Sequence, residues 1–424
     1  MMRVFWFSPV PPSKTDIANY SNRLFKYLND LVELVVLCPE GIECDADASG
    51  VKIRSISSVT GLDLNGADVC IYNIGNNADF HSQIFEMLTL HPGVTILHDR
   101  CLLEFFLGYL GLNNGTAINA LDLRVSMGQW YGGEGLRKAV DLLKGHESAA
   151  AVAEQFPLYE IIADRSLAVI CHNEEIFDEI RGKYPFFPIK YLNLPYPSSG
   201  DLGCPTLQAG KFKFVAFGFM GGNRRLREFL AAWAESRWKH NFELDIAGVV
   251  ESVDDLKREL TTLGLAEQVR FHGFLSEEQL NALIRGSHLA INLRYPSMGE
   301  ASGSQLRIWY NGKASIVTDV GWYSGLPDDA VIKISPDKEH ESLLDLFELL
   351  AKGKIDLVRM GCAGAENLKA HCPRQYANDL VDWIFRNKYK FINEWSRRRA
   401  LARIAAVQSE VSDLDVIMPS SKIG

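Results

Sequence analysis

Short apolar segments alternate with amphipathic segments along most of the chain, and this alternation restricts the fold more than any other feature of the sequence. Apolar segments separated by helical patterns are typical of parallel β-sheets, which helices cover on both faces. Two such series follow one another, so the sequence predicts an α/β protein with two doubly wound domains. The apolar segments of the first series are RVFWFSP, LVELVVLCP, DVCIYNIG, GVTILHD, LAVICHN and IKYLNLP, and those of the second are KFKFVAFG, FELDIAGVV, VRFHGF, HLAINLRYP, ASIVTDVGW and AVIKI.

The length of the chain agrees with two domains. A single hydrophobic core stops growing at roughly 250–300 residues, and this chain has 424. The stretch 196–211 (YPSSGDLGCPTLQAGK) gathers Pro, Ser and Gly without periodicity, which predicts a domain boundary there. We therefore expect an N-terminal domain over 1–200 with a helical insertion at about 111–160, a C-terminal domain over 206–385, and a basic helical tail over 386–424.

The charge balance argues against one class of function. With 44 Lys and Arg against 53 Asp and Glu the net charge is −9, whereas nucleic-acid-binding proteins normally carry a basic excess. No nucleic-acid partner is therefore expected. The tail departs from this balance, because its helical pattern carries Lys388, Lys390, Arg397, Arg398, Arg399 and Arg403. This pattern indicates a solvated helix face, which we favour, or a peripheral contact with a membrane surface.

The N-terminus resembles a first β-strand and not a signal peptide, because Pro9, Pro11 and Pro12 cut its apolar stretch short. No apolar run approaches the ~18–20 residues of a membrane span. We therefore expect a cytoplasmic protein, at most peripheral to a membrane. The eight cysteines include no CxxC pair, and the DxD-like strings at 45–47 and 413–415 lie away from the candidate site segments. No metal site and no cofactor are predicted.

The second domain opens with FKFVAFGFMGGNRRLREFLAAW, in which a strand leads into Gly218, Gly221 and Gly222 before a helix begins. Glycines allow a backbone to approach a ligand closely, and the N–H groups at a helix start favour a phosphate. Arg224 and Arg225 add cations suited to a diphosphate. The spacing is not that of a GxGxxG dinucleotide motif. A tight turn whose glycines serve only packing is an equally good interpretation.

The most informative segment is HLAINLRYPSMGEASGSQLRIWYNGKASIVTDVGW, at 288–322. A strand is followed by a polar loop with Glu300, and then Ser302, Gly303 and Ser304 open a helix. Small residues at a helix start, beyond the carboxyl end of a parallel strand, are where open α/β sheets bind anions. Glu300 either accepts hydrogen bonds from sugar hydroxyls or only balances the helix dipole.

This segment is similar to the donor-binding motif of the retaining family 4 glycosyltransferases, which pair two Rossmann-like domains in the GT-B architecture. Glu300 and Gly303 match the first part of the motif, and Gly312 with KASIV matches its end. FGFMGGNRRL stands where the family has a phosphate-contacting Arg/Lys segment. FSPVPPSKTDIANYSNRL resembles the family's first loop and helix, and YNIGNNADFHSQIFEMLTLHPGVTILHD resembles a branch that assembles bacterial polysaccharides. The resemblance covers roughly residues 3–385.

The resemblance implies two Rossmann-like domains that face each other across a cleft, and a retaining, hexosyltransferase-type glycosyltransferase that needs no metal. It implies a nucleotide-sugar donor and a glycan or lipid-linked glycan acceptor, in the biosynthesis of a surface polysaccharide such as lipopolysaccharide, in the cytoplasm or beside the inner membrane. The implied catalytic residues are Glu300 and His98. The implied donor-binding residues are Gly218, Arg224, Arg225, Phe274, Ser302, Gly303, Ser304 and Arg307, and those of the acceptor side are Asp16, Asn76, Asn77 and His81.

Several of these side chains also have a structural interpretation. His98 follows the strand GVTILHD, and it either contacts the donor sugar or caps the next helix. Asn76 and Asn77 follow another strand, and they either line the acceptor site with His81 or provide only turn chemistry.

Two positions depart from the family pattern. Arg307 stands where the family has a second Glu that holds the ribose hydroxyls, and a cation cannot accept those hydrogen bonds. Asp16 stands where the first loop has a Gly, and its charge opposes a diphosphate unless Arg224 or Lys14 offsets it. Two alternatives therefore stay open: a non-catalytic, glycosyltransferase-like subunit that binds glycans or acts as a scaffold, and a nucleotide-sugar epimerase, which shares the two-domain architecture.

Overall fold

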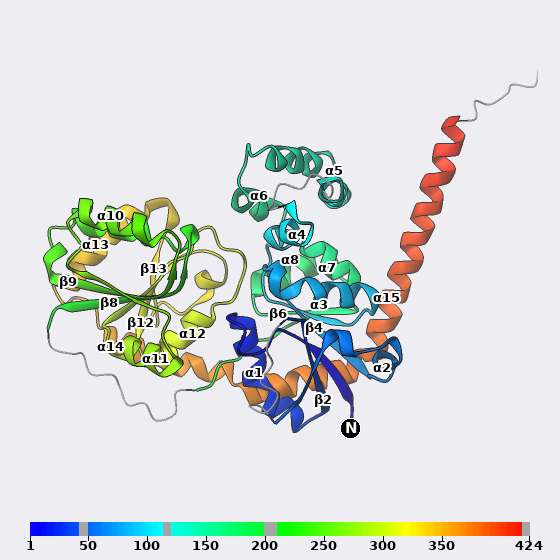
Figure 1. The fold of residues 1–424 in the computed structure, drawn as a ribbon, viewed down its shortest axis with the longest axis horizontal. Helices are drawn as coiled ribbons and strands as arrows, with labels where there is room; N and C mark the ends of the chain where they lie inside the picture. The colour runs from blue at the N-terminus through cyan, green and yellow to red at the C-terminus, as the bar shows by residue number, and fades with distance from the viewer. Residues whose placement is uncertain (42–49, 113–119, 199–209, 418–424) are drawn as a thin grey trace, which may run out of the picture.

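The structure is a computed structural model that describes residues 1–41, 50–112, 120–198 and 210–417. Two parallel β-sheets form its framework, one in each half of the chain (Figure 1). Helices pack on both faces of each sheet, which is the layered arrangement of a doubly wound domain.

The N-terminal sheet has seven parallel strands in the order β3-β2-β1-β4-β5-β6-β7. Strand β1 shows why the central strands of this sheet are mostly apolar. Phe5 and Phe7 pack into the core on one face of the sheet, while Val4 and Trp6 pack into the core on the other. Burying one such side chain stabilises the fold by about 1.5–3 kcal/mol. The strands are β1 (Arg3–Phe7), β2 (Glu33–Cys38), β3 (Lys52–Ser55), β4 (Val69–Ile74), β5 (Val94–Leu97), β6 (Ala168–Cys171) and β7 (Ile189–Tyr191).

The C-terminal sheet has six parallel strands in the order β10-β9-β8-β11-β12-β13. The order third, second, first, fourth, fifth, sixth is that of the Rossmann fold, and the N-terminal sheet repeats it with one further strand. The predicted class, two Rossmann-like doubly wound domains, is therefore confirmed. The strands are β8 (Phe212–Met220), β9 (Phe242–Val250), β10 (Val269–Gly273), β11 (Leu289–Asn292), β12 (Ala314–Thr318) and β13 (Ile332–Ile334).

Helices occupy the connections that the amphipathic segments predicted. Those of the N-terminal domain are α1 (Asp16–Asn29), α2 (Gly61–Asn65), α3 (Ala78–Leu90), α4 (Leu103–Tyr109), α5 (Ala120–Leu143), α6 (Ala149–Gln155), α7 (Tyr159–Arg165) and α8 (Glu174–Lys183). Those that follow β8 are α9 (Leu226–Glu235), α10 (Val253–Leu263), α11 (Glu277–Arg285), α12 (Gly303–Tyr310), α13 (Glu339–Ala351), α14 (Leu357–Asn367) and α15 (Pro373–Ile417).

The helical insertion lies between β5 and β6, where α5 and α6 stand outside the layers of the N-terminal domain (Figure 1). Leu123 and Met127 of α5 are buried in the same core as Phe5, so the insertion is docked on its own domain. Helix α5 is interrupted at Gly132, whose φ of 65° and ψ of −151° are not helical.

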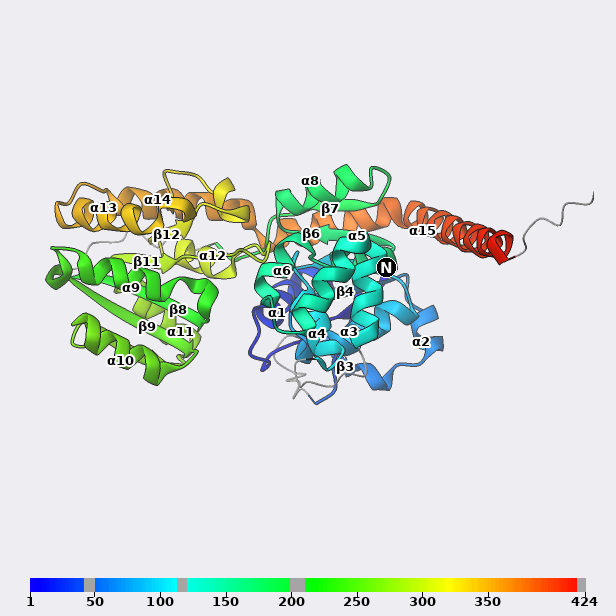
Figure 2. The ribbon, with the colours of Figure 1, turned by 90° about the horizontal axis from the view of Figure 1, so that it is seen from above.

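The final helix, α15, begins beside the C-terminal domain and then runs along the N-terminal one (Figures 1 and 2). Leu380 and Ile384 pack in the same hydrophobic cluster as Val4 and Trp6 of β1. The hydroxyl of Tyr376 lies 2.6 Å from that of Tyr20 on α1. The predicted boundary at residue 385 therefore falls inside one continuous helix that joins the two domains.

The basic run of this helix is partly used inside the molecule. Nη2 of Arg398 donates to the carbonyl of Ser166 at 2.7 Å, and Nη2 of Arg399 lies 3.0 Å from a carboxylate oxygen of Asp164. These two cations attach α15 to the end of α7. The two predicted alternatives, a solvated helix face and a peripheral membrane contact, therefore stay open for the other cations of this basic run. Within the described ranges, no helix is long and apolar enough to cross a membrane.

Candidate active site

The two domains touch through a loop that follows β11. The backbone N–H groups of Arg100 and Cys101 both donate to the carbonyl of Met298, at 3.0 Å each. Gly299 has a φ of +76°, and a Cβ there would lie 2.4 Å from the Cβ of Arg100, so only glycine fits this contact. The loop that carries Glu300 is thus held where the domains meet.

Two contacts within the loop fix Glu300. One carboxylate oxygen lies 3.0 Å from Nε of Arg294, and the other accepts a hydrogen bond of 2.9 Å from the N–H of Met298. The two side chains of the ion pair are only 13% and 15% exposed. Burial lowers the pKa of Arg294, but the charge of Glu300 and other neighbours outweighs this effect and raises it overall. Arg294 therefore stays a cation and orients the Glu300 carboxylate.

Arg224 lies in the turn after β8, where Nη1 donates to Oδ1 of Asn292 at 3.3 Å. Burial, and secondarily the charge of Arg294, lowers the pKa of Arg224 to about 10, so it remains a cation at neutral pH. Gly218 borders the guanidinium, because a Cβ at this position would lie 3.4 Å from Nη2. Among the described residues, no carboxylate forms an ion pair with Arg224.

The start of α12 is tied to Arg224 through Asn292. Nδ2 of Asn292 donates to Oγ of Ser302 at 3.4 Å and to Oε1 of Gln305 at 3.0 Å. Ser302 caps the helix by accepting the N–H of Gln305 at 3.1 Å. At Gly303, the first residue of the helix, no heavy atom lies within 4 Å of the position that a Cβ would take. The first turn of α12 is therefore open beside the Gly303 backbone.

These groups form a site of positive charge. The N–H groups in the first turn of a helix, here those of Gly303 and Ser304, have no partners within the helix and carry partial positive charge. Together with the Arg224 guanidinium they suit an anion such as a diphosphate. Among the residues that the structure describes, no cluster of His, Cys, Asp or Glu is arranged to hold a metal ion.

Sequence reasoning missed two members of this site, Asn292 and Gln305. Asn292 is a polar residue at the end of the apolar strand LAIN, and this contrast could have identified it as a candidate site residue. Gln305 is completely buried inside α12, where it also accepts a hydrogen bond of 3.0 Å from Oγ of Ser315. Nothing in the sequence pattern distinguishes it from an exposed helix residue.

Arg225 points away from Arg224, although the two are adjacent in sequence. Nε of Arg225 donates to both carboxylate oxygens of Glu339, at 3.0 and 3.2 Å, and Nη1 lies 2.8 Å from Glu228. Two carboxylates thus neutralise this cation on the side of α13. The structure does not bring Arg225 together with the other predicted donor-binding residues.

Arg307 is used in the packing of α12 against α11. Its guanidinium donates to Oε1 of Glu277 at 3.1 Å and to Oδ1 of Asn281 at 3.3 Å. Arg307 therefore binds side chains of α11, whereas a Glu at this position could accept hydrogen bonds from hydroxyl groups.

Phe274, beyond the end of β10, is 70% exposed. Nζ of Lys14 lies 5.2 Å from the centre of its ring, which is a cation–π contact between the domains. Asp16 is exposed at the first turn of α1, two residues after Lys14. The first loop of the N-terminal domain thus reaches the C-terminal domain, as the resemblance implied for a two-domain site.

His98 lies at the end of β5 inside a polar and aromatic cluster. Its Nε2 lies 3.1 Å from Oδ1 of Asn73, whose Nδ2 donates to the carbonyl of Phe7 at 3.0 Å. This arrangement makes Oδ1 the acceptor and places the proton of His98 on Nε2. The ring of Tyr20 packs edge-on against it, with 4.7 Å between ring centres. Burial lowers the pKa of His98 well below its usual range, so the imidazole is neutral at pH 7.

Asp99, the neighbour of His98, is a carboxyl group that titrates near neutral pH. One oxygen accepts a hydrogen bond of 2.8 Å from the N–H of Asn76. Burial, and secondarily the charge of Glu300, raises the pKa of Asp99 to about 7. The sequence placed Asp99 beside a candidate catalytic residue but gave it no role of its own.

The residues predicted for the acceptor side have local partners. Oδ1 of Asn76 accepts the N–H of Phe105 at 3.0 Å, and the side chain of Asn77 accepts the N–H of Asp79 at 2.9 Å as the cap of α3. These contacts are those expected of turn and cap residues. His81 is buried, with Nδ1 3.0 Å from the carbonyl of Asn73, and burial lowers its pKa to about 4. A role for these residues toward an acceptor stays a prediction.

Residues 206–366 match the family model described as Glycosyl transferases group 1. The matched range contains Arg224, Glu300 and the start of α12, and it identifies the C-terminal domain as a glycosyltransferase group 1 domain. No curated protein sequence matches the chain significantly.

Many solved structures are similar to this one. WaaG, a glycosyltransferase involved in lipopolysaccharide biosynthesis, is 14% identical with a TM-score of 0.52, and the match covers 88% of this chain and 95% of that one. Anabaena Alr3699/HepE in complex with UDP-glucose is 12% identical with a TM-score of 0.57, covering 90% and 99%. Sucrose-phosphate synthase from Thermosynechococcus elongatus is 12% identical with a TM-score of 0.58, covering 92% and 100%. At these identities the likeness shows the fold, which is the GT-B fold.

Proposed function

We propose that this chain, whose residues 206–366 form a glycosyltransferase group 1 domain, moves a sugar from a nucleotide-sugar donor to a glycan or lipid-linked glycan acceptor with retention of configuration. One observation carries the proposal: the partly buried guanidinium of Arg224 is linked through Asn292 to the start of α12, so two sources of positive charge converge on one place. Two of the similar solved structures support this choice of donor and product. One was solved with UDP-glucose and another takes part in lipopolysaccharide biosynthesis. We therefore favour a surface polysaccharide as the product.

The leaving group determines what the site must stabilise. When the bond between the anomeric carbon and the diphosphate breaks, negative charge gathers on the diphosphate oxygens. Arg224 and the N–H groups of Gly303 and Ser304 would neutralise that charge without a metal. The bond from the acceptor oxygen to the anomeric carbon forms on the same face, and the acceptor proton passes to the departing phosphate oxygen. No basic side chain is needed for this proton transfer.

Glu300 and His98 would hold the sugar. The carboxylate of Glu300 is oriented by Arg294 and has lone pairs that can accept hydrogen bonds from sugar hydroxyls. His98 carries its proton on Nε2, which faces Asn73, so Nδ1 is left as a hydrogen-bond acceptor. Glu300 lies in the loop that contacts the N-terminal domain, and His98 lies two residues before Arg100, which binds that loop. Closure of the domains around a donor would bring both residues to the same sugar.

Titration of the full-length chain with UDP-, GDP- and dTDP-sugars in a calorimeter tests the proposal. We expect one nucleotide class to bind and to release nucleoside diphosphate slowly when an oligosaccharide acceptor is added. If none of these donors binds at millimolar concentration, the proposal fails.

A non-catalytic glycan-binding or scaffold subunit is the second candidate, and the contacts of Arg307 favour it. Arg307 stands where the family has the Glu that accepts the ribose hydroxyls, and its guanidinium pairs with Glu277. The expected acceptor of these hydroxyls is therefore missing. Such a subunit would bind no nucleotide sugar. An epimerase, the remaining alternative, would bind the donor and change its sugar without any acceptor, which product analysis by NMR detects.

A further inference from the structure

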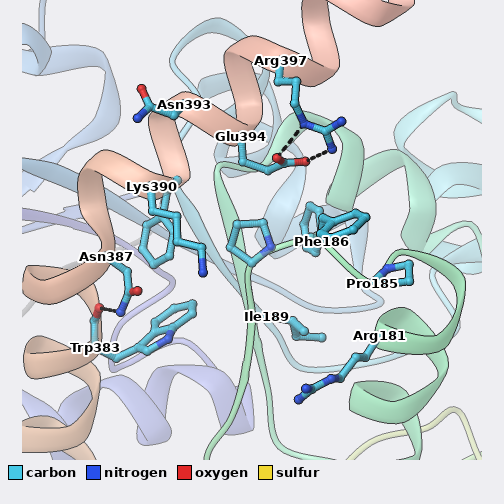
Figure 3. Close-up of a pocket in the computed structure, with 13 residues that line it drawn as sticks. Arg181, Pro185, Phe186, Ile189, Trp383, Asn387, Lys390, Asn393, Glu394 and Arg397 are labelled. Atoms are coloured by element: carbon cyan, nitrogen blue, oxygen red, sulfur yellow. Dashed lines mark hydrogen bonds and ion pairs between the residues drawn. The ribbon is translucent and has the colours of Figure 1, made fainter.

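A pocket of about 560 Å³ lies between α15 and the segment that joins α8 to β7 (Figure 3). Lys390 and Trp383 of α15 point toward Ile189 and Arg181 on the opposite wall. Nothing in the proposed transfer uses this pocket.

The pocket is separate from the candidate active site. Helix α8 begins at the contact between the domains, where Asn173 at its cap donates to the carbonyl of Gly299 at 3.3 Å. Arg181, which lines the pocket, lies in the last turn of the same helix. Arg181 follows Asn173 by eight residues, which span about 12 Å along a helix. A ligand in the pocket is therefore held about that far from the Glu300 loop.

The charge of the pocket suits an anion. Lys390 and Arg181 line it, and within the described part of the chain neither forms an ion pair. Arg397 is bound by two hydrogen bonds of 2.8 and 2.9 Å to Glu394. The lining thus has an excess of positive charge, although the whole chain carries a net charge of −9.

The remaining lining offers ring surfaces beside amide groups. Phe186 is 76% exposed, and Trp383 packs against Phe391 with 4.7 Å between ring centres. The side chain of Asn393 makes no hydrogen bond within the described residues, and the side chain of Asn387 uses one N–H for the carbonyl of Trp383 at 2.8 Å. Flat apolar rings with free amide groups at their edges match a pyranose, which has one apolar face and a rim of hydroxyls.

A membrane surface fits these residues less well. Helix α15 exposes Phe385, Tyr389 and Ile392, but this apolar stripe does not share a face with the cations of the pocket. Tyr389 and Lys390 are consecutive residues of a helix, so their side chains point about 100° apart. A flat bilayer that receives Tyr389 would leave the pocket turned away from it.

We propose that this pocket binds an acidic saccharide. Its ring would stack on Phe186 and Trp383, its hydroxyls would bond Asn387 and Asn393, and its carboxylate or phosphate would meet Lys390 and Arg181. This inference rests on the proposed function in one respect, since the saccharide is then a unit of the acceptor glycan remote from the growing end. The pocket would hold the polymer while its end is extended.

The test is calorimetric titration of the full-length chain with hexagalacturonate and with tetrameric sialic acid, and with neutral maltohexaose for comparison. The variants are Arg181→Gln with Lys390→Gln, and separately Phe186→Ala; all three positions are exposed, so folding is preserved. Arg386→Gln is the matched control, because Arg386 is an exposed cation of the same helix outside the pocket lining, with Nε 2.7 Å from Asp382. UDP-glucose is titrated in parallel with every variant.

We expect at least one acidic oligosaccharide to bind, and the double variant to weaken it about tenfold or more, since two charge-assisted contacts are lost. Phe186→Ala should weaken it as well, Arg386→Gln should not, and maltohexaose should bind more weakly. The proposal is overturned if neither acidic oligosaccharide binds, or if the double variant binds the acidic oligosaccharide as the wild type does. Loss of UDP-glucose binding alone would count against the proposed function and not against the pocket.

Discussion

Nε of Arg294 lies 3.0 Å from the carboxylate of Glu300, and the carbonyl of Met298 in the same loop binds two N–H groups of the N-terminal domain. The orientation of this carboxylate therefore depends on the contact between the domains. A change in the contact between the domains is therefore expected to move the Glu300 carboxylate, which we propose binds the sugar.

The ion pair itself is open to a double-mutant cycle. Because both side chains are largely buried, Glu300→Gln should leave an uncompensated cation and destabilise the fold by about 3 kcal/mol. In the double variant Arg294→Met with Glu300→Gln that cation is gone, and part of the loss, about 1–2 kcal/mol, should be recovered. Urea unfolding measures all four proteins. If the free-energy losses of the two single variants simply add up in the double variant, the two side chains are not coupled and the prediction is wrong.

Asp99 should make stability depend on pH. Burial raises its pKa to about 7, against about 3.9 in an unfolded chain, so the native state holds the proton more tightly. The stabilisation is complete below about pH 4 and is lost as the pH rises through about 7, with a total of up to about 4 kcal/mol. Asp99→Asn should remove this part of the slope. Urea midpoints between about pH 4.5 and pH 8 measure it, and an unchanged slope in the variant would show that another group is responsible.

Gly299→Ala should disturb the contact between the domains. The new Cβ would need to occupy a position 2.4 Å from the Cβ of Arg100, at a φ of +76° that other residues rarely adopt. We expect a loss of about 2–4 kcal/mol in the free energy of unfolding. Gly182→Ala is the control, because this helical glycine has no atom near the added Cβ, and the change should be neutral or stabilising by up to about 1 kcal/mol. If the two variants are equally stable, the loop around Gly299 can shift away from Arg100 at no cost, and the prediction is wrong.

Much of the fold could be predicted, because buried strands such as LAIN and ASIVT carry their signal within a few residues. The contacts of α15 could not, since the attachment of Arg398 to Ser166 joins residues 232 positions apart. The same limit applies to the site. The sequence placed Arg224 and Arg225 side by side, but the partner of Arg225 is Glu339, 114 positions away, and no spacing rule reveals it.

The proposed diphosphate site is tested most directly by the affinity of the full-length chain and of Arg224→Gln for the nucleotide sugar that binds best, with UDP-glucose tested first. Arg227→Gln is the matched control, since this neighbouring arginine is exposed on α9 and pairs with Glu259. Removing a partly buried cation that meets a diphosphate should weaken binding at least about tenfold, whereas Arg227→Gln should bind as the wild type does. Equal affinity of Arg224→Gln and the wild type would contradict a diphosphate site at the start of α12.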